Sequence, residues 1–364
     1  MKSYKLLTPG PLTTTMSVKA AMQFDRCTWD DDYKQITRKI RRQLLAIAGV
    51  SPAEYTAVLL QGSGSFGVEA VLTTAVGPAG KCLFITNGAY GERMVKMASY
   101  MGLCHTVLAM PCNQVPAAAD IEKILAGDEA ITHVALVHCE TTSGILNPLA
   151  EIAQITKAYG KILIVDAMSS FGGVEIPVQE LGIDYLVSSA NKCIQGVPGF
   201  CFVLARIDLL QQCEGNARSL VLDLYDQWRH MDGDGKWRYT SPTHVVAAFS
   251  QALDELEAEG GVQARQQRYQ ASNDLLRTRL KELGFAAYIA EERQSPIITT
   301  FLFPDAAFCF QDFYQHVKER GYVLYPGKLT DSDTFRIGNI GEIYETDIQQ
   351  VCEIIAEYMR RRQT

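Results

Sequence analysis

The sequence lacks the features that mark membrane-embedded, secreted and nucleic-acid-binding proteins. No apolar run approaches the roughly 20 residues needed to cross a bilayer. The first residues hold no long apolar segment typical of a secretion signal. Lysine and arginine number 34 against 41 aspartates and glutamates, so the formal net charge is −7 and the basic surplus of a nucleic-acid binder is missing. We therefore expect a cytoplasmic protein that binds neither nucleic acid nor a membrane.

Clusters of metal-binding residues are also missing. The ten cysteines include no C-x-x-C pair, the spacing typical of zinc sites and redox motifs, and the six histidines are scattered. A chain of this length needs no disulfide bonds to hold its fold, and thiols stay reduced in the cytosol. We therefore expect no metal site, and we expect most cysteines to be small buried hydrophobic side chains.

What the sequence has is the composition of an ordinary globular chain. Its 364 residues are 47% hydrophobic and 21% charged, and this length corresponds to about two domains. Short aliphatic runs, typical of strands buried on both faces, alternate with amphipathic stretches typical of helices. The expected strands are 56–60, 82–86, 133–138, 162–166, 185–188 and 200–205, and the expected helices are 65–76, 91–101, 120–126 and 149–159.

This alternation predicts an α/β fold with a mostly parallel sheet covered by helices on both sides. After Pro242 the pattern changes to two long helical stretches and then to short strands and helices. The helices expected there are 243–260, 262–283, 309–320 and 346–361, and the strands are 297–303, 322–325 and 334–337. We therefore expect an N-terminal segment packing near the active site (1–15), a large domain (16–245) and a smaller C-terminal α+β domain (246–364).

A glycine-rich segment follows one strand, at the edge of the sheet where open α/β folds place their ligand sites. The segment QGSGSFGVEA (61–70) leaves a strand and opens a helix. Its glycines let a ligand approach the backbone, and the helix N-terminus offers unpaired N–H groups to a phosphate. Glycine turns between strand and helix are equally common without a ligand, so this segment alone leaves both interpretations open.

Asp166 and Lys192 carry a more specific signal. Asp166 ends the apolar strand ILIVD, where a buried carboxylate needs a partner, and Lys192 follows the next strand, 26 residues later, in a glycine-flanked turn. This spacing suits an enzyme that uses pyridoxal 5′-phosphate (PLP), because a lysine can form a Schiff base with PLP while an aspartate pairs with its pyridine nitrogen. A helix cap at Asp166 and a solvated charge at Lys192 are the alternatives.

Arg336 in FRIGNIG (335–341) is the candidate for binding an anionic substrate. It lies on a short predicted strand beside Gly338 and Gly341. Its planar guanidinium can hold a carboxylate with two hydrogen bonds. A surface ion pair is the alternative.

Six motifs occur along the chain in a set order: TPGP (8–11), GSGS (62–65), NGAYGERM (87–94), HCETTSG (138–144), VDAMSSFGG (165–173) and SANKCIQGVPG (189–199). In kind and order they resemble those of the class V, fold-type I PLP-dependent aminotransferases. The blocks CTWDDDY (27–33), SLVLDLYDQW (219–228), KWRYTSPTH (236–244), SPIIT (295–299) and YPGK (325–328) resemble the branch that acts on 2-aminoethylphosphonate and pyruvate. The resemblance covers essentially the whole chain.

The resemblance implies a role for each matching residue around PLP. Lys192 would form the Schiff base and shuttle a proton, and Asp166 would pair with the pyridine nitrogen. Ser63, Gly64 and Ser65 would bind the phosphate.

Four more residues complete the implied site. Tyr90 would cover the ring with its phenol face, and Thr141 would approach the 3′ oxygen. Thr240 would reach the phosphate of the neighbouring subunit, which implies a homodimer with shared active sites. Arg336 would hold the carboxylate of pyruvate or alanine.

The reaction that the resemblance implies moves the amino group of 2-aminoethylphosphonate to pyruvate, giving phosphonoacetaldehyde and L-alanine. An alanine– or serine–glyoxylate aminotransferase of the same family is the alternative, against which Tyr90 and the blocks CTWDDDY and KWRYTSPTH weigh. A PLP cysteine desulfurase needs a mobile catalytic cysteine, whereas Cys309 lies in a predicted helix. A nucleotide-dependent dehydrogenase needs an acidic residue that ends a strand about 20 positions after its glycines, and none follows here.

Overall fold

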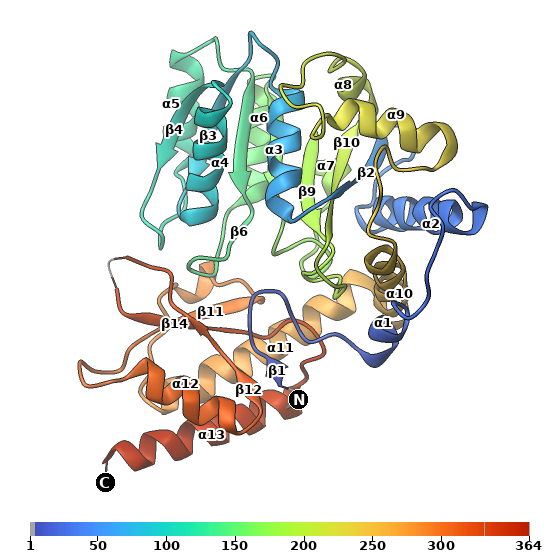
Figure 1. Cartoon of the computed structure of the whole chain (residues 1–364). Coiled ribbons are helices and arrows are strands. Elements are labelled where there is room, and N and C mark those ends of the chain that lie inside the picture. Colours follow the sequence, from blue (N-terminus) through green and yellow to red (C-terminus); the bar gives the residue numbers. More distant parts are fainter. Residues whose placement is uncertain (1–3, 331, 364) are drawn as a thin grey trace.

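Seven strands form the central sheet, and six of them are aliphatic runs that need cover on both faces. The computed structural model describes residues 4–330 and 332–363, and its large sheet has the strand order β2-β10-β9-β8-β5-β3-β4 (Figure 1). The strands are β2 (Tyr55–Gln61), β3 (Lys81–Thr86), β4 (Cys104–Ala109), β5 (His133–Val137), β8 (Ile162–Asp166), β9 (Tyr185–Ser189) and β10 (Phe200–Arg206).

Most of this sheet is parallel. Within it, β10 runs antiparallel to its neighbours β2 and β9, and the other neighbouring pairs are parallel. The α/β class predicted from the sequence is thereby confirmed. The edge strand β4 is not among the expected strands, because His105 and Thr106 interrupt its apolar run.

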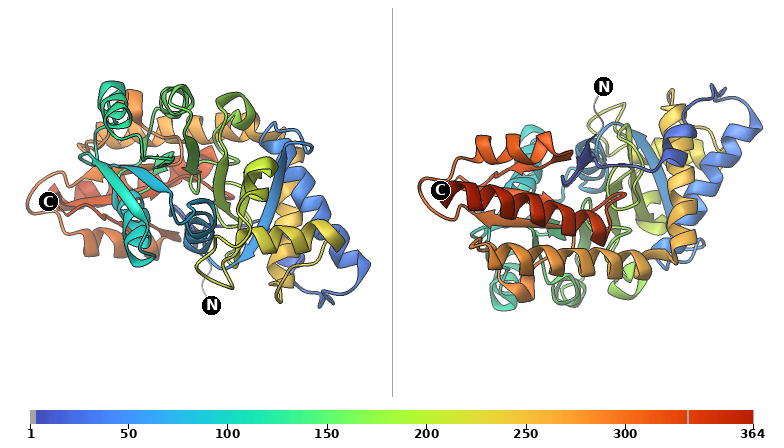
Figure 2. Two further views of the ribbon diagram at one scale, coloured as in Figure 1. Left: turned by 90° about the horizontal axis from the view of Figure 1, so that it is seen from above. Right: turned by 90° about the horizontal axis from the view of Figure 1, so that it is seen from below.

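Helices cover both faces of the sheet, as the view from above in Figure 2 shows. On one face α3 packs against β9 and β10 and α4 packs against β3, while α6 packs against β8. The helices α2 and α9 are not among those expected from the sequence. The helices of this part are α1 (Met16–Ala20), α2 (Asp31–Ile47), α3 (Gly64–Ala75), α4 (Ala89–Tyr100), α5 (Ala118–Gly127), α6 (Leu149–Ala158), α7 (Val178–Leu181), α8 (Ile207–Gln211), α9 (Leu224–Asp234) and α10 (Thr243–Glu259).

The C-terminal part has its own antiparallel sheet in the order β11-β14-β13, as expected of an α+β domain. Seen from below in Figure 2, α13 lies alongside α11 and α12. The single strand expected over 322–325 is two strands with different partners, since β12 pairs with β1 (Lys5–Leu6) and β13 pairs with β14. The elements are α11 (Gly261–Glu282), β11 (Ile298–Leu302), α12 (Phe310–Glu319), β12 (Tyr322–Val323), β13 (Tyr325–Pro326), β14 (Thr334–Gly338) and α13 (Glu345–Gln363), with a 3₁₀ turn at Glu291–Arg293.

A short hairpin connects the two parts. It consists of β6 (Cys139–Glu140) and β7 (Ile145–Leu146), and it follows β5 directly. At its tip, the backbone N–H of Ser295 donates to the oxygen of Gly144 at 2.9 Å. Among the helices of residues 4–330 and 332–363, none combines the length and apolarity that a bilayer crossing requires.

The expected boundary between residues 245 and 246 falls inside α10. Val246 and Leu256 on this helix belong to the hydrophobic core of the large sheet, whereas Leu276 and Leu280 on α11 belong to that of the small domain. Gly260 between the two helices has a φ of +106°, which lets the chain change direction. We therefore propose that the domains divide at Gly260, because burial assigns α10 to the large domain.

The small domain holds the N-terminal segment. β1 (Lys5–Leu6) pairs in parallel with β12, and the two lie side by side in Figure 1. The Gly338 N–H donates to the backbone oxygen of Leu7 at 3.0 Å. A Cβ at Gly338 would lie 2.7 Å from the backbone oxygen of Thr8, so the segment crosses the end of β14 at a distance too short for a side chain.

We expect Gly338→Ala to lower the free energy of unfolding by about 1–3 kcal/mol, the usual cost of forcing extra atoms into a packed site. The added methyl group would push Thr8 and the N-terminal segment away from β14. Urea unfolding of parent and variant measures the difference. Gly127→Ala is the matched control, because a Cβ there meets nothing within 4 Å, and its stability should stay equal or rise. Equal stability of Gly338→Ala and the parent would show that the contact does not constrain this position.

Candidate active site

A cavity of about 220 Å³ opens at the carboxyl ends of the central strands. β8 ends at Asp166 and the turn after β9 carries Lys192, so both side chains reach it. The helices α3 and α4 present their N-terminal residues to the same cavity. Of the residues expected from the sequence, its lining contains Ser63, Gly64, Ser65, Tyr90, Asp166 and Lys192, while Thr141, Thr240 and Arg336 lie outside the lining.

Lys192 lies in the turn between β9 and β10, with its amine beside the N-terminal segment. Its Nζ donates to the backbone oxygen of Pro9 at 2.9 Å. Gly10 passes so close that a Cβ there would lie 2.9 Å from Lys192 Cδ. Burial lowers the pKa of the Lys192 amine, against the attraction of Cys193 and Asp166. A lowered pKa leaves more of the amine uncharged, which is the form that can attack an aldehyde.

Asp166 is 5% exposed at the end of β8. Its Oδ1 accepts the backbone N–H of Met168 at 2.8 Å, which orients the carboxyl group. Burial raises the pKa of Asp166 to about 6, although the Met168 N–H lowers it. A carboxylate so placed gains from a cationic partner, and the nitrogen of a protonated pyridine ring is one.

The predicted phosphate site lies at the N-terminus of α3. Gly62 has a φ of +108°, which turns the chain sharply from β2, and Ser63 is the N-cap residue of this 12-residue helix. The first N–H groups of a helix have no partner inside it and suit an anion. Arg93 Nη1 donates to Ser65 Oγ at 3.2 Å and adds a positive charge beside the loop.

A buried carboxylate, Glu140, positions Tyr90 at the start of α4. Glu140 Oε2 accepts the backbone N–H groups of Tyr90 and Gly91, each at 3.2 Å, and Oε1 accepts the hydroxyl of Thr142 at 2.6 Å. Burial raises the pKa of Glu140, and these donors act against that rise. Sequence reasoning missed Glu140, although an acidic residue close to the end of a buried strand is the signal that identified Asp166.

Arg336 reaches the site from β14 of the small domain and is 4% exposed. Its Nη1 donates to the backbone oxygen of Thr141 at 3.0 Å, and its Nε donates to that of Pro326 at 3.1 Å. The Thr141 hydroxyl is hydrogen-bonded to Ser169 Oγ at 2.7 Å. Arg336 and Thr141 are therefore joined across the two domains, beside the cavity.

Two further cations contact the phenol ring of Tyr90. Lys328 Nζ lies 4.1 Å and Arg93 Cζ 4.9 Å from its centre, and the charge of Arg336 also acts on this phenol. Burial lowers the pKa of Lys328, and the charges of Arg93 and Arg336 lower it further. Lys328 is missed from the sequence because a lysine in a loop resembles a solvated charge, and only the packing of the small domain brings it to Tyr90.

Thr240 lies apart from the cavity. Its side chain is exposed, and its backbone oxygen accepts Gln61 Nε2 at 2.8 Å. Gln61 is the last residue of β2 and precedes the phosphate-site loop. The contact expected between Thr240 and the phosphate of a neighbouring subunit stays a prediction.

The donor set fits PLP. The helix N-terminus and Arg93 suit the phosphate, Asp166 suits a protonated ring nitrogen, the Tyr90 ring offers a flat apolar face, and Lys192 offers an amine to the aldehyde. Within the described ranges, no group of three or more histidine, cysteine, aspartate or glutamate side chains could hold a metal ion.

Comparison with known proteins places the chain among aminotransferases. The family model "Aminotransferase class-V" matches residues 25–330. A protein of Lysinibacillus sphaericus named 2-aminoethylphosphonate–pyruvate transaminase is 62% identical over 359 residues, which cover 99% of this chain and 98% of that protein. A protein of the same name from Phocaeicola vulgatus is 54% identical over 357 residues, covering 98% of this chain and 99% of that protein.

Solved structures share the fold. Pyridoxamine–pyruvate aminotransferase from Mesorhizobium loti has a TM-score of 0.91 at 21% identity, covering 100% of this chain and 94% of that chain. Alanine–glyoxylate aminotransferase from Nostoc sp. has a TM-score of 0.90 at 23% identity, covering 99% and 96% of the two chains. These likenesses confirm the fold-type I architecture expected from the sequence motifs.

Asp166 should destabilise the cofactor-free protein near neutral pH. Because folding raises its pKa from 3.8 to about 6, its favourable contribution is complete below about pH 4 and is lost as the pH rises through 6. We expect cofactor-free Asp166→Asn to exceed the parent in stability above pH 6 by up to about 3 kcal/mol, since each pKa unit corresponds to about 1.4 kcal/mol. Urea unfolding between about pH 4 and 8 measures this difference.

Asp120→Asn, on the exposed surface of α5, is the control for that experiment and should keep the pH profile of the parent. A stability difference between Asp166→Asn and the parent that does not change with pH would contradict the assigned burial effect.

Proposed function

The chain belongs to the class V aminotransferases, and we propose that it transfers the amino group of 2-aminoethylphosphonate to pyruvate, giving phosphonoacetaldehyde and L-alanine. The two relatives described above carry this donor and acceptor in their names, at 62% and 54% identity over nearly the full chain. The glyoxylate-specific alternative is supported only at the level of the fold, because the Nostoc enzyme shares 23% of its residues with this chain.

The observation that supports the chemistry is the meeting of Lys192, Asp166 and the N-terminus of α3 in one cavity. An amine with a lowered pKa, a buried carboxylate and a set of free N–H donors are the groups that bind an aromatic aldehyde bearing a phosphate. Class V aminotransferases are PLP-dependent enzymes, and PLP is the group that we place there.

Bound at this site, PLP withdraws electrons from the amino-bearing carbon of the substrate and so makes its proton acidic. Lys192 would hold the cofactor covalently until the amine of the substrate displaced it, and the freed Lys192 amine could then accept that proton and later return it. Asp166 would keep the ring nitrogen protonated. Tyr90 would cover the ring and help to exclude water from it.

The substrates differ in the charge of their anionic ends. A phosphonate can carry two negative charges and a carboxylate carries one, and both must bind in turn at the same place. Arg336 serves both as a planar two-pronged donor. Lys328 and Arg93, at the Tyr90 ring, supply the positive charge that balances the second charge of the phosphonate.

We place a second copy of the chain over the exposed side of the site. Near Thr240 the apolar side chains of Trp29 and Leu220 are 69% and 73% exposed, and such a patch gains from a partner surface. Lys236 Nζ lies 5.1 Å from the Trp29 ring, and Arg238 Nη1 donates to the Leu220 oxygen at 2.6 Å, so one surface carries all of them. In this homodimer Thr240 of each subunit would reach the phosphate bound by the other. The cytoplasmic location of the protein stays a prediction from the sequence.

An amino-donor screen with pyruvate tests the proposed reaction. With the PLP-loaded enzyme we expect L-alanine to form from 2-aminoethylphosphonate at least roughly 100-fold faster than from serine or other amino acids. Lys192→Ala should keep the parent's circular dichroism spectrum and form no alanine, because it has no amine to move the proton. A preference for serine with glyoxylate would select the alternative. Turnover of Lys192→Ala within about tenfold of the parent would remove Lys192 from the reaction.

Lys328→Gln and Arg336→Lys should separate the two anionic substrates. Arg336→Lys keeps the charge and loses the planar fork, so kcat/KM should fall for both substrates, by about 2–5 kcal/mol in transition-state binding. Lys328→Gln should lower kcat/KM for 2-aminoethylphosphonate by about tenfold and leave that for pyruvate within about twofold. Steady-state kinetics with each substrate varied in turn gives these values. Equal losses for both substrates in Lys328→Gln would show that Lys328 does not distinguish them.

A further inference from the structure

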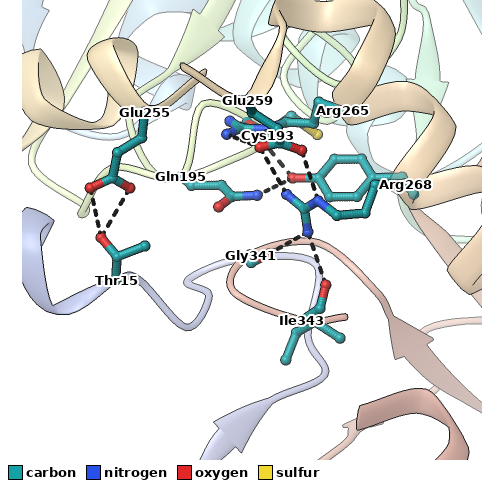
Figure 3. Close-up of polar contacts among 10 residues, drawn as sticks. Thr15, Cys193, Gln195, Glu255, Glu259, Arg265, Arg268, Gly341 and Ile343 are labelled. Atoms are coloured by element: carbon teal, nitrogen blue, oxygen red, sulfur yellow. Dashed lines mark hydrogen bonds and ion pairs between the residues drawn. The ribbon is translucent and has the colours of Figure 1, made fainter. Parts of the chain in front are cut away.

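A chain of polar contacts leads away from Cys193, the residue after Lys192 (Figure 3), and none of its residues belongs to the cavity lining. The backbone oxygen of Cys193 accepts Arg265 Nη1 at 2.8 Å. Arg265 is 2% exposed, one of the largest fully buried side chains, and its Nη2 donates to Glu259 Oε2 at 2.6 Å. A buried arginine therefore connects the lysine turn to the end of α10.

Glu259 binds a second arginine on its other side. Arg268 Nε donates to Glu259 Oε1 at 2.8 Å, and Arg268 Nη1 donates to the backbone oxygens of Gly341 and Ile343 at 3.1 and 2.9 Å (Figure 3). Those two residues follow β14, the strand of Arg336. One carboxylate thus ties the turn of the cofactor lysine to the strand of the substrate arginine.

Glu259, Arg265 and Arg268 form a charged bridge in which an arginine binds each side of the carboxylate. Glu259 is 25% exposed at the junction of α10 and α11. Partial burial favours its neutral form, but the hydrogen bonds from Arg268 and Arg265 outweigh that effect and hold the pKa of Glu259 below its ordinary value. Hydrogen bonds between ionised partners are shorter and stronger than those between neutral groups. We therefore expect the bridge to resist changes in the spacing of the segments that it joins.

The lysine turn needs such support. Gln195, three residues after Lys192, has a φ of +68°, the one positive φ of a non-glycine residue among the described residues. Its Nε2 donates to the hydroxyl oxygen of Tyr269 at 2.6 Å. Arg265, Arg268 and Tyr269 stand three and four residues apart on α11, so one face of this helix carries every contact. A strained turn keeps its conformation only where the surrounding structure holds it.

We propose that Glu259, acting through Arg265 and Arg268, is a positioning residue that sets the spacing between Lys192 and Arg336. The proposal rests on the proposed function in that Lys192 moves the proton and Arg336 binds the substrate. The bridge has two arms, one through Arg265 to the lysine turn and one through Arg268 to the residues after β14, and we expect them to have different effects. The Arg265 arm supports the lysine and so affects the rate of the chemical step, whereas the Arg268 arm supports the arginine strand and so affects substrate affinity.

The same helix offers a matched control. Glu255, one turn before Glu259 on α10, accepts Thr15 Oγ1 at 2.9 Å and 3.0 Å through its two oxygens (Figure 3). This contact leads to the N-terminal segment and joins neither arm. Glu255→Gln therefore removes the same charge from the same helix as Glu259→Gln and leaves the bridge in place.

Single-turnover reactions of the PLP-loaded protein with L-alanine give a maximal rate and an apparent Kd for each variant. Glu259→Gln should lower the rate about tenfold and raise Kd about fivefold, since small displacements of reacting groups are costly. Arg265→Lys should lower the rate and leave Kd within about twofold. Arg268→Lys should raise Kd and leave the rate within about twofold, and Glu255→Gln should change neither by more than that.

Hydrogen exchange on the same variants supplies a readout that does not depend on activity. Glu259→Gln should speed exchange in peptides covering both 190–196 and 339–344, and Glu255→Gln should speed it in neither. If Arg265→Lys fails to fold in a thermal unfolding test, Glu259→Gln and Arg268→Lys still decide the question.

Equal behaviour of Glu259→Gln and Glu255→Gln would overturn the proposal. The proposal would also be overturned if Arg265→Lys and Arg268→Lys each changed both the rate and Kd, because the two arms would then have no separate effects. A parent protein that reacts with neither L-alanine nor 2-aminoethylphosphonate would instead contradict the proposed function. The exchange experiment would still test the bridge in that case, so the two failures are distinguishable.

Discussion

Burial of ionisable groups at the edge of an apolar sheet is the constraint on which the rest of this structure depends. Asp166 ends a strand whose other residues are aliphatic, and burial raises its pKa to about 6. Lys192 lies in the same cavity, and burial lowers the pKa of its amine. A bound cation would stabilise the buried carboxylate of Asp166, and an aldehyde could react with the uncharged amine of Lys192. The site is therefore prepared for its ligand at the expense of the stability of the empty protein, as is common for active sites.

Each of the two domains supplies different groups to the site. The large sheet supplies the buried pair and the anion-binding N-terminus of α3. The small domain brings Lys328 and the charge of Arg336 to Tyr90, which lines the cavity, and it also holds the N-terminal segment whose Pro9 oxygen accepts the lysine amine. Because Arg336 donates to the Thr141 oxygen of the large domain, the proposed cofactor and substrate sites share one contact between the domains. The relative placement of the domains thus decides whether the site is complete.

The positive charges around Tyr90 are the basis of the selectivity that we propose. A single guanidinium would bind a carboxylate and a phosphonate alike, since both accept two parallel hydrogen bonds. Lys328 and Arg93 lie next to the same ring, with Glu140 as the nearby acid, and in our proposal their charges favour a dianion over a monoanion. Glu140 accepts the backbone N–H groups of Tyr90 and Gly91, so a buried carboxylate fixes the position of the ring that these cations contact.

The sequence by itself determined the α/β sheet and predicted which polar residues lie at its edge, because both are local signals. An aliphatic run predicts a buried strand, and the polar residue just past its end lies at the carboxyl edge whatever else the chain does. Asp166, Lys192 and the loop before α3 were identified in this way. The motif order also identified the family correctly. Glu140 carried the same local signal and was missed only because no partner for it stands nearby in the sequence.

Tertiary structure alone decided the contacts between distant parts of the chain. Arg336 and Thr141 are 195 residues apart, and nothing in either segment predicts that their atoms meet. The placement of Lys328 at Tyr90 and the bridge through Glu259 depend in the same way on how the small domain packs. The inclusion of α10 in the large core depends on its packing against α2 and α1. For a charged side chain in a loop or at a helix end, the neighbouring sequence looks the same whether the side chain contacts solvent or a buried partner. Only the packing of the two domains distinguishes these cases, because the energy of a buried charge depends on what surrounds it in space.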